Sequence, residues 1–309
     1  MSLTARFIGS NADWAEFSPS LLAEFSTLPF EITLSADAAP EASDYIVMTG
    51  ASQYIDFKPY KNCKAMLRLW AGVDDVAQND TINFPICRMV GGGLESGMIE
   101  WVTAHVMRHH VGIDTHIHGQ DGNWRGNIAP PLASDRPVTI LGLGALGAAC
   151  GQVLTTLGFP VTGWSRSAKS IDGIRCLHGD LCEALENAQI VVTLLPRTPA
   201  TENILNAETI AYTARGATIL NPGRGELIDD DALLDALTTG QLSHATLDTF
   251  RQEPLPTAHT FWSHPKITVT PHIASATRPA PAAKVIANNI MRNEAGLSLL
   301  HAVNRTAGY

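Results

Sequence analysis

One strand–loop–helix segment constrains the fold of this sequence more than any other feature. The apolar run 138–141 has the pattern of a buried strand, a GxGxxG motif follows it directly, and residues 148–157 have a helical pattern. In such a motif Gly142 permits a tight turn, Gly144 lets a phosphate approach the backbone, and Gly147 lets the helix pack closely on the strand. The N–H groups at a helix N-terminus also attract phosphates. The segment therefore predicts an α/β fold that binds a dinucleotide.

Strand-like and helix-like stretches alternate on both sides of this motif. Before it, strands are predicted at 6–9, 45–49 and 65–70, and a helix is predicted with Ser18 as N-cap and Pro19 in its first turn. The other predicted strands are 161–164, 190–195, 218–220, 245–248 and 267–270. A second main helix is predicted at 94–110, and a closing helix with a tail is predicted over 279–300. This alternation favours parallel sheets, and 309 residues suit two domains better than one core.

Composition and charge narrow the class of protein. A hydrophobic content of 45% and a charged content of 17% are typical of a globular chain. The net charge of -9 argues against non-specific binding to nucleic acid or acidic membranes, and no apolar run approaches the roughly 20 residues of a membrane span. Residues 1–13 lack a secretory signal pattern, and the five cysteines form no CxxC pair. We therefore expect reduced thiols in a cytoplasmic protein.

The strand after the glycine motif bears on the choice of dinucleotide. NAD sites normally carry Asp or Glu about 20 residues after the motif, where it bonds the ribose 2′-OH. Here the strand ends in Trp164-Ser165-Arg166-Ser167, with Lys169 beyond and no carboxylate at that place. Basic side chains pair with a 2′-phosphate, and serine hydroxyls donate hydrogen bonds to it. We predict NADPH as the preferred cofactor, with NADH as an alternative; a solvated basic turn would also explain these residues.

Three functional side chains follow the later predicted strands. Arg224 follows the strand at 218–220, Glu253 follows that at 245–248, and His272 follows that at 267–270. Ligands of open α/β sheets bind at the carboxyl ends of the strands, so these side chains are expected to meet there. Reduction of a keto acid needs a cation for the carboxylate, a proton donor for the carbonyl oxygen and a carboxylate that favours the charged donor. Arginine, histidine and glutamate supply these three groups.

Structural interpretations compete with the functional ones. Arg224 could cap a turn, and Glu253 could pair with a neighbouring arginine. The spacing of His105, His109 and His110 would suit metal ligands on one helix face, but no glutamate stands in an HExxH frame. A partly buried helix explains these histidines, and we predict no metal site.

Taken together, the motifs resemble the D-isomer-specific 2-hydroxyacid dehydrogenase family over essentially the whole chain. The matching segments are 71–74, 142–147, 195–201, 221–225, 248–254 and 270–272. Segments 158–160, 164–166, 273–279 and 304–309 are most similar to a bacterial group of glyoxylate/hydroxypyruvate reductases. The resemblance implies a Rossmann dinucleotide-binding domain of residues 96–277, with a dimerisation arm at about 112–137. It also implies a smaller, flavodoxin-like substrate domain made of residues 1–95 and 278–309.

The resemblance implies a role for each matching residue. Arg224 binds and orients the substrate carboxylate and carbonyl, His272 delivers the proton, and Glu253 hydrogen-bonds His272. Backbone N–H groups in the substrate loop bind the carboxylate; this loop comprises Trp70, Ala71, Gly72 and Val73. Asp248 bonds the nicotinamide carboxamide, and the remaining cofactor contacts are Gly142, Leu143, Gly144, Ala145, Leu146, Gly147, Leu195, Pro196 and Thr201.

Three positions leave alternatives open. The resemblance implies a two-fold dimer in which Trp124 reaches toward the partner's active site, but a surface aromatic at an ordinary interface is the alternative. Some relatives carry Trp where this sequence has Met48. Trp70 is an alternative aromatic for the same region, so the sequence does not decide the preferred substrate size. Arg278 either contacts the rim of the active site or begins the last helix.

The sequence therefore predicts NADPH-dependent reduction of small 2-keto acids, from glyoxylate to glycolate and from hydroxypyruvate to D-glycerate. One alternative is a family member that acts on bulkier 2-keto acids. Another is a binding protein that senses dinucleotides, against which the intact set of Arg224, Glu253 and His272 argues.

Overall fold

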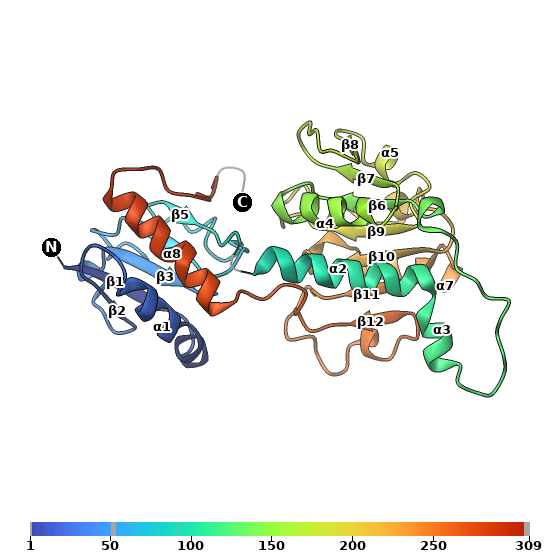
Figure 1. Ribbon diagram of the computed structural model, residues 1–309, viewed down its shortest axis with the longest axis horizontal. Coiled ribbons are helices and arrows are strands. Elements are labelled where there is room, and N and C mark those ends of the chain that lie inside the picture. Colours follow the sequence, from blue (N-terminus) through green and yellow to red (C-terminus); the bar gives the residue numbers. More distant parts are fainter. Residues whose placement is uncertain (1, 51–53, 92, 306–309) are drawn as a thin grey trace. The chain divides into compact units, whose positions relative to one another are not determined.

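The computed structural model describes residues 2–50, 54–91 and 93–305 (Figure 1). The chain divides into two compact units. Met1–Glu95 and Ala276–Tyr309 form the terminal unit, and Ser96–Ser275 form the central unit. Each unit contains one sheet, and every strand pair in both sheets is parallel.

The terminal unit has a five-stranded sheet in the order β2-β1-β3-β4-β5. Its strands are β1 (Leu3–Ile8), β2 (Ile32–Ser35), β3 (Tyr45–Met48), β4 (Ala65–Arg68) and β5 (Ile86–Cys87). Helices α1 (Asn11–Phe25) and α8 (Pro279–Glu294) bury their apolar faces in one core with these strands, and a short turn, η1, spans Pro40–Ala42. This strand order is the flavodoxin-like order.

The central unit has a seven-stranded sheet in the order β12-β11-β10-β9-β6-β7-β8. Its strands are β6 (Val138–Leu141), β7 (Val161–Trp164), β8 (Ile174–Leu177), β9 (Ile190–Thr193), β10 (Ala217–Asn221), β11 (Leu242–Leu247) and β12 (Ile267–Val269). The order reverses between β6 and β9, which is the doubly wound arrangement with its ligand-binding switch point.

Helices and 3₁₀ turns connect the strands of the central unit (Figure 1). The helices are α2 (Leu94–Val111), α3 (Ile113–His118), α4 (Ala145–Thr156), α5 (Leu181–Leu185), α6 (Ala207–Ile210) and α7 (Asp230–Thr239). The turns are η2 (Ala133–Asp135), η3 (Gly225–Leu227) and η4 (Thr260–Trp262). Between η2 and α3, residues 119–132 have no regular secondary structure. Within the described residues, we find no helix with the length and apolar character of a membrane span.

The predicted α/β fold class is confirmed, and β6 and β7 have the predicted bounds. The sequence reasoning missed β2, β5 and β8, which all lie at sheet edges. Only one residue of β2 and one of β8 is buried, and β5 has two residues. Such strands lack the continuous apolar run that marks a strand covered on both faces.

The prediction that the first helix begins at Ser18 is wrong. The N-cap of α1 is Ser10, whose hydroxyl accepts a bond from the Asp13 N–H at 3.1 Å, while the Asp13 carboxylate accepts one from the Ser10 N–H at 2.9 Å. This capping box stabilises a helix that runs on through Pro19. Over the segment predicted as a closing helix with a tail, α8 ends at Glu294, two residues before Gly296 with its φ of 71°.

Two histidines stack where α2 packs against the sheet of the central unit. His109 of α2 hydrogen-bonds Thr246 of β11 at 2.9 Å, His244 hydrogen-bonds Thr268 at 2.9 Å, and the ring centroids are 4.9 Å apart. Burial lowers the pKa of His109 to about 3 and that of His244 to about 4, with further lowering by nearby positive charge. Over the described ranges, His, Cys, Asp and Glu side chains form no group of three able to hold a metal.

The buried histidine pair is expected to make the protein less stable in mild acid. The unfolded chain binds protons near pH 6.5, whereas the folded protein keeps His109 neutral down to about pH 3, so stability falls as pH drops from about 7 to 4. At pH 5, the difference in proton binding at His109 lowers the free energy of unfolding by about 2 kcal/mol. In the His109→Gln variant, the free energy of unfolding measured with urea should depend less steeply on pH. An unchanged slope would contradict this origin of the acid sensitivity.

Candidate active site

The glycine motif makes a turn that side chains would block. Gly142 has a φ of 111°, and a Cβ there would lie 2.6 Å from the Leu194 carbonyl oxygen. A Cβ at Gly147 would lie 1.9 Å from the Gly142 carbonyl oxygen. By contrast, a Cβ at Gly144 would meet no atom within 4 Å among the described residues. The backbone is thus packed tightly on two sides and open at Gly144, as a phosphate cradle requires.

Some residues around this turn shape the loops, and others offer backbone N–H groups to a ligand. Leu143 and Leu195 are buried, and the Thr201 hydroxyl donates to the Pro196 carbonyl oxygen at 2.7 Å, so these residues shape the two loops at the switch point. Ala145 and Leu146 form the first turn of α4, where Gly144 provides no capping side chain. Their N–H groups therefore fit the dinucleotide phosphates that the motif predicts.

The turn after β7 carries the residues predicted to recognise a 2′-phosphate. Three of these residues, Arg166, Ser167 and Lys169, are exposed to solvent. Ser165 is buried and donates its hydroxyl to the Ser167 carbonyl oxygen at 2.8 Å, so it fixes the turn instead of offering that proton to a ligand. Trp164 donates its indole N–H to the Gly179 carbonyl oxygen at 3.2 Å and flanks the turn.

His272 and Glu253 form a hydrogen-bonded pair in the central unit. Nδ1 of His272 lies 2.7 Å from Oε2 of Glu253, and Oε1 of Glu253 accepts the Phe250 N–H at 2.9 Å. Burial acts to raise the pKa of the Glu253 carboxyl, but the bonds from His272 and Phe250 and the charge of Arg224 outweigh it and hold the pKa below its usual value. The carboxylate is thus ionised beside the imidazole at neutral pH.

A buried carboxylate holds the turn that presents His272. His272 has a φ of 53°, which is uncommon for a residue other than glycine. Asp248 is fully buried, and its carboxylate accepts bonds from the Thr270 hydroxyl at 2.5 Å and from the N–H groups of Ile273 and Ala274 at 2.9 Å each. Asp248 therefore supports the turn around His272, a role that its sequence position did not reveal.

Arg224 lies in the loop that follows strand β10, at the N-cap of η3. The Asn221 side chain positions it, because its amide donates to the Arg224 carbonyl oxygen at 2.9 Å while its oxygen accepts the Thr193 hydroxyl at 2.5 Å. The Arg224 guanidinium also donates to the Gly223 carbonyl oxygen at 2.7 Å. Sequence reasoning missed Asn221, although a polar residue at the end of a buried strand was its signal.

The predicted substrate loop belongs to the terminal unit. Arg68 is almost fully buried and forms two 2.9 Å bonds with the Asp75 carboxylate, which anchors the loop at its base. Along the loop, Trp70 is exposed, Ala71 and Gly72 are half-buried and Val73 is buried.

The structure shows the surroundings of those residues of the terminal unit whose roles the sequence left undecided. Met48 has an exposed fraction of 0% and packs in a core cluster with Phe57 and Met66, so it lines no binding surface. The Trp70 ring instead lies against Gly50, where a Cβ would be only 2.0 Å from it. Arg278 occupies the N-cap position of α8, and its side chain makes no capping hydrogen bond.

Comparison with known proteins identifies the family. Residues 101–274 match the family described as D-isomer specific 2-hydroxyacid dehydrogenase, NAD binding domain. The chain belongs to this family. It is 39% identical over 256 residues to glyoxylate/hydroxypyruvate reductase A of Serratia proteamaculans, covering 80% of this chain and 82% of that protein.

Two solved structures extend the similarity to the whole chain. A D-isomer specific 2-hydroxyacid dehydrogenase from Xanthobacter autotrophicus in complex with NADPH and MES has a TM-score of 0.91 at 34% identity, with 100% of both chains covered. The NADPH-dependent glyoxylate/hydroxypyruvate reductase from Sinorhizobium meliloti in complex with NADP and sulfate has a TM-score of 0.89 at 29% identity, again with 100% of both chains covered. This protein is therefore an NAD(P)-dependent 2-hydroxyacid dehydrogenase.

Two glycine substitutions should separate folding of the dehydrogenase from cofactor binding. Gly144→Ala meets open space and should preserve thermal stability, but its methyl group should weaken dinucleotide binding at least tenfold by keeping phosphate from the backbone. Gly147→Ala should lower stability, because its methyl group meets the Gly142 carbonyl. Thermal unfolding and cofactor fluorescence titration measure the two effects. Equal loss of stability in both variants would contradict the assignment.

Proposed function

We propose that this dehydrogenase reduces small 2-keto acids, glyoxylate and hydroxypyruvate, with NADPH as hydride source and His272 as general acid. The observation that carries the proposal is the 2.7 Å pair of His272 and Glu253, with the Arg224 charge acting on the same carboxylate. An acid, its partner and a carboxylate anchor are the groups that reduction of a keto acid needs. The name of the Serratia relative supports these substrates.

NADPH is proposed over NADH on the turn after β7. Arg166 and Lys169 are exposed there and no carboxylate follows the strand directly, which suits a 2′-phosphate. The two solved relatives in complex with NADPH and NADP support this preference. We propose that the open face at Gly144 and the first turn of α4 hold the pyrophosphate, and that the segments at Leu195–Thr201 and Asp248 complete the site.

In the proposed mechanism, the chain's own residues hold the substrate and supply the proton. A nicotinamide held there would supply the hydride for the carbonyl carbon. The Arg224 guanidinium holds the keto acid by its carboxylate. Because Nδ1 of His272 is bonded to Glu253, Nε2 is the atom that gives its proton to the carbonyl oxygen. His272 then takes a proton from solvent, and the ionised Glu253 stabilises the charged imidazole again.

We also propose that the segment at 112–137 is a dimerisation arm. It carries a set of exposed apolar side chains: Ile113, Ile117, Trp124, Ile128 and Leu132. Trp124 is 96% exposed, an unfavourable state for a large aromatic in a monomer. In this proposal a partner subunit covers the arm. Sedimentation velocity should give a dimer that Trp124→Ala weakens, whereas a wild-type monomer at micromolar concentration would reject the proposal.

Turnover of defined keto acids tests the substrate and cofactor together. With NADPH, kcat/KM should be higher for glyoxylate and hydroxypyruvate than for pyruvate or phenylpyruvate. NADPH should be preferred over NADH, and Arg166→Ala should reduce that preference about tenfold by removing a charge-assisted bond to the 2′-phosphate. Initial rates of cofactor oxidation measure these values. Faster turnover of phenylpyruvate would favour a bulkier physiological substrate, and a tenfold preference for NADH would exclude the cofactor assignment.

The acid–carboxylate pair makes a separate prediction. His272→Asn should lower kcat about 10²–10⁴-fold, because the proton donor is lost, while asparagine tolerates the positive φ at this position. Glu253→Gln should lower kcat less, because the neutral amide still bonds the imidazole but no longer stabilises its charge. NADPH affinity should stay within about twofold in both variants. A His272→Asn protein with normal kcat would refute the proton-donor role.

A further inference from the structure

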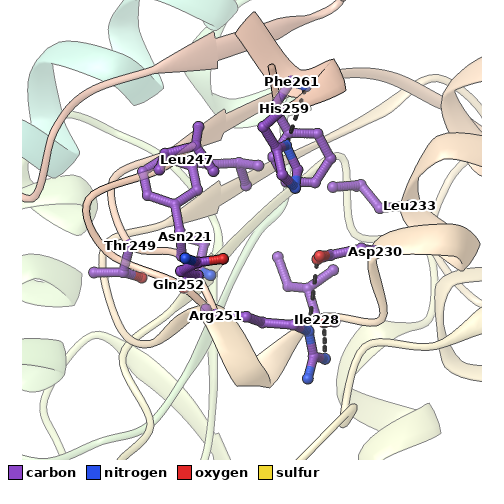
Figure 2. A pocket seen from close by; sticks show the side chains of 13 residues that line it. Asn221, Ile228, Asp230, Leu233, Leu247, Thr249, Arg251, Gln252, His259 and Phe261 are labelled. Atoms are coloured by element: carbon purple, nitrogen blue, oxygen red, sulfur yellow. Dashed lines mark hydrogen bonds and ion pairs between the residues drawn. The ribbon is translucent and has the colours of Figure 1, made fainter. Parts of the chain in front are cut away.

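A pocket lies in the central unit beside the loops that carry the candidate active site (Figure 2). It has a volume of about 190 Å³, which is the share of about six water molecules. Asn221 and Gly225 line it from the Arg224 loop, and residues 249–252 line it from the Glu253 loop. The side chains of Arg224, Glu253 and His272 are not among its lining residues, so this space is distinct from the proposed reaction site.

Most of the pocket wall is apolar and already ordered. Ile228, Leu233, Leu247, Phe250 and Phe261 contribute side chains that belong to one core cluster of the central unit. Figure 2 shows Leu233, Leu247 and Phe261 around the same space. A wall of this kind favours a compact aliphatic group over a flexible polar one.

Charges of both signs lie at the more exposed part of the pocket. Arg251 and Asp230 form an ion pair with 3.8 Å between Nε and Oδ1, and their side chains are 32% and 35% exposed. The Arg251 guanidinium also donates to the Asn203 side chain and to the Ile228 carbonyl oxygen. His259 also lines the pocket, and its Nδ1 accepts the Phe261 N–H at 3.3 Å. Burial raises the pKa of the Asp230 carboxyl, against the charge of Arg251.

The pocket also contains a buried hydroxyl that no described group satisfies. Thr249 has an exposed fraction of 2%, and its Oγ1 makes no hydrogen bond within the described part of the chain. A buried polar atom without a partner costs free energy, which a ligand or a water in the pocket would recover. Thr249 lines the pocket, so this atom is an independent sign of an occupant.

The combination of walls and charges defines a class of ligand. Because Asp230 and Arg251 are 3.8 Å apart, a ligand with a single charge would be attracted by one of these groups and repelled by the other. A zwitterion satisfies both groups, with its ammonium toward Asp230 and its carboxylate toward Arg251, while an aliphatic body fills the apolar part. We propose that this pocket binds a small apolar α-amino acid, and that the bound ligand changes turnover through residues 249–253.

The loop geometry supplies the route to turnover, and this part rests on the proposed function. Phe250 contributes to the pocket wall and donates its N–H to Glu253, which in turn bonds His272. A Cβ at Gly225 would lie 2.1 Å from the Phe250 carbonyl carbon, so the Arg224 and Glu253 loops are in direct backbone contact. A ligand that packs against Phe250 therefore displaces the support of the proton donor.

Calorimetry with L-leucine tests the site on the full-length protein. L-Leucine should bind, and 4-methylpentanoate and 3-methylbutylamine, which each lack one charge, should bind at least tenfold more weakly. Asp230→Asn should weaken leucine binding about tenfold. Asp231→Asn is the matched control, because Asp231 is in the same first turn of α7 but does not line the pocket. Leu255→Trp, which fills the pocket from a half-buried position, should abolish binding.

The outcomes decide the two parts of the proposal separately. No heat with L-leucine, or equal affinity in the Asp230→Asn and Asp231→Asn proteins, would overturn the site; equal affinity would place leucine elsewhere, for example at Arg224. Saturating leucine should change kcat for glyoxylate at least twofold in the wild type and not in Leu255→Trp. Binding without a change in kcat would overturn the coupling. Absence of turnover without leucine would count against the proposed function instead, since calorimetry needs no turnover.

Discussion

The buried carboxylate of Asp248 is the interaction on which the candidate active site depends most. A fully buried charge is costly unless donors surround it, and here the Thr270 hydroxyl and two backbone N–H groups compensate it. All three donors flank His272, so the free energy gained by satisfying Asp248 holds the imidazole in its positive-φ turn. The hydrogen bond between Glu253 and Nδ1 of His272 then orients the imidazole and leaves its Nε2 without that partner.

Parallel-sheet topology explains how distant residues reach one edge. Strands β10, β11 and β12 are neighbours, so the loops that follow them lie together although Arg224, Glu253 and His272 are well separated along the chain. The glycine turn follows β6, on the other side of the switch point. The same sheet therefore offers one edge for a dinucleotide and a keto acid, and β11 contributes Leu247 to the wall of the pocket.

The sequence predicted the elements that are buried on both faces and the residues with unusual backbone demands. The runs at β6 and β7 and the glycines after β6 were read correctly because few other structures suit them. Edge strands such as β8 were missed because one buried residue gives no pattern. The helix start at Ser10 was missed because Pro19 offered a stronger local signal. Support by Asp248 and Asn221 was invisible, since it depends on contacts between separate loops.

In the proposed function, the half of the central sheet that carries the chemistry is separate from the half that recognises the adenosine end of the cofactor. Arg166 and Lys169 are exposed after β7, whereas the supports of His272 are buried between β11 and β12. Changes at the exposed turn therefore leave the proton donor undisturbed. In evolution, a lineage with this architecture can exchange one nicotinamide pool for the other by a few surface substitutions, and so adapt to the redox metabolism of its host cell without rebuilding its catalyst.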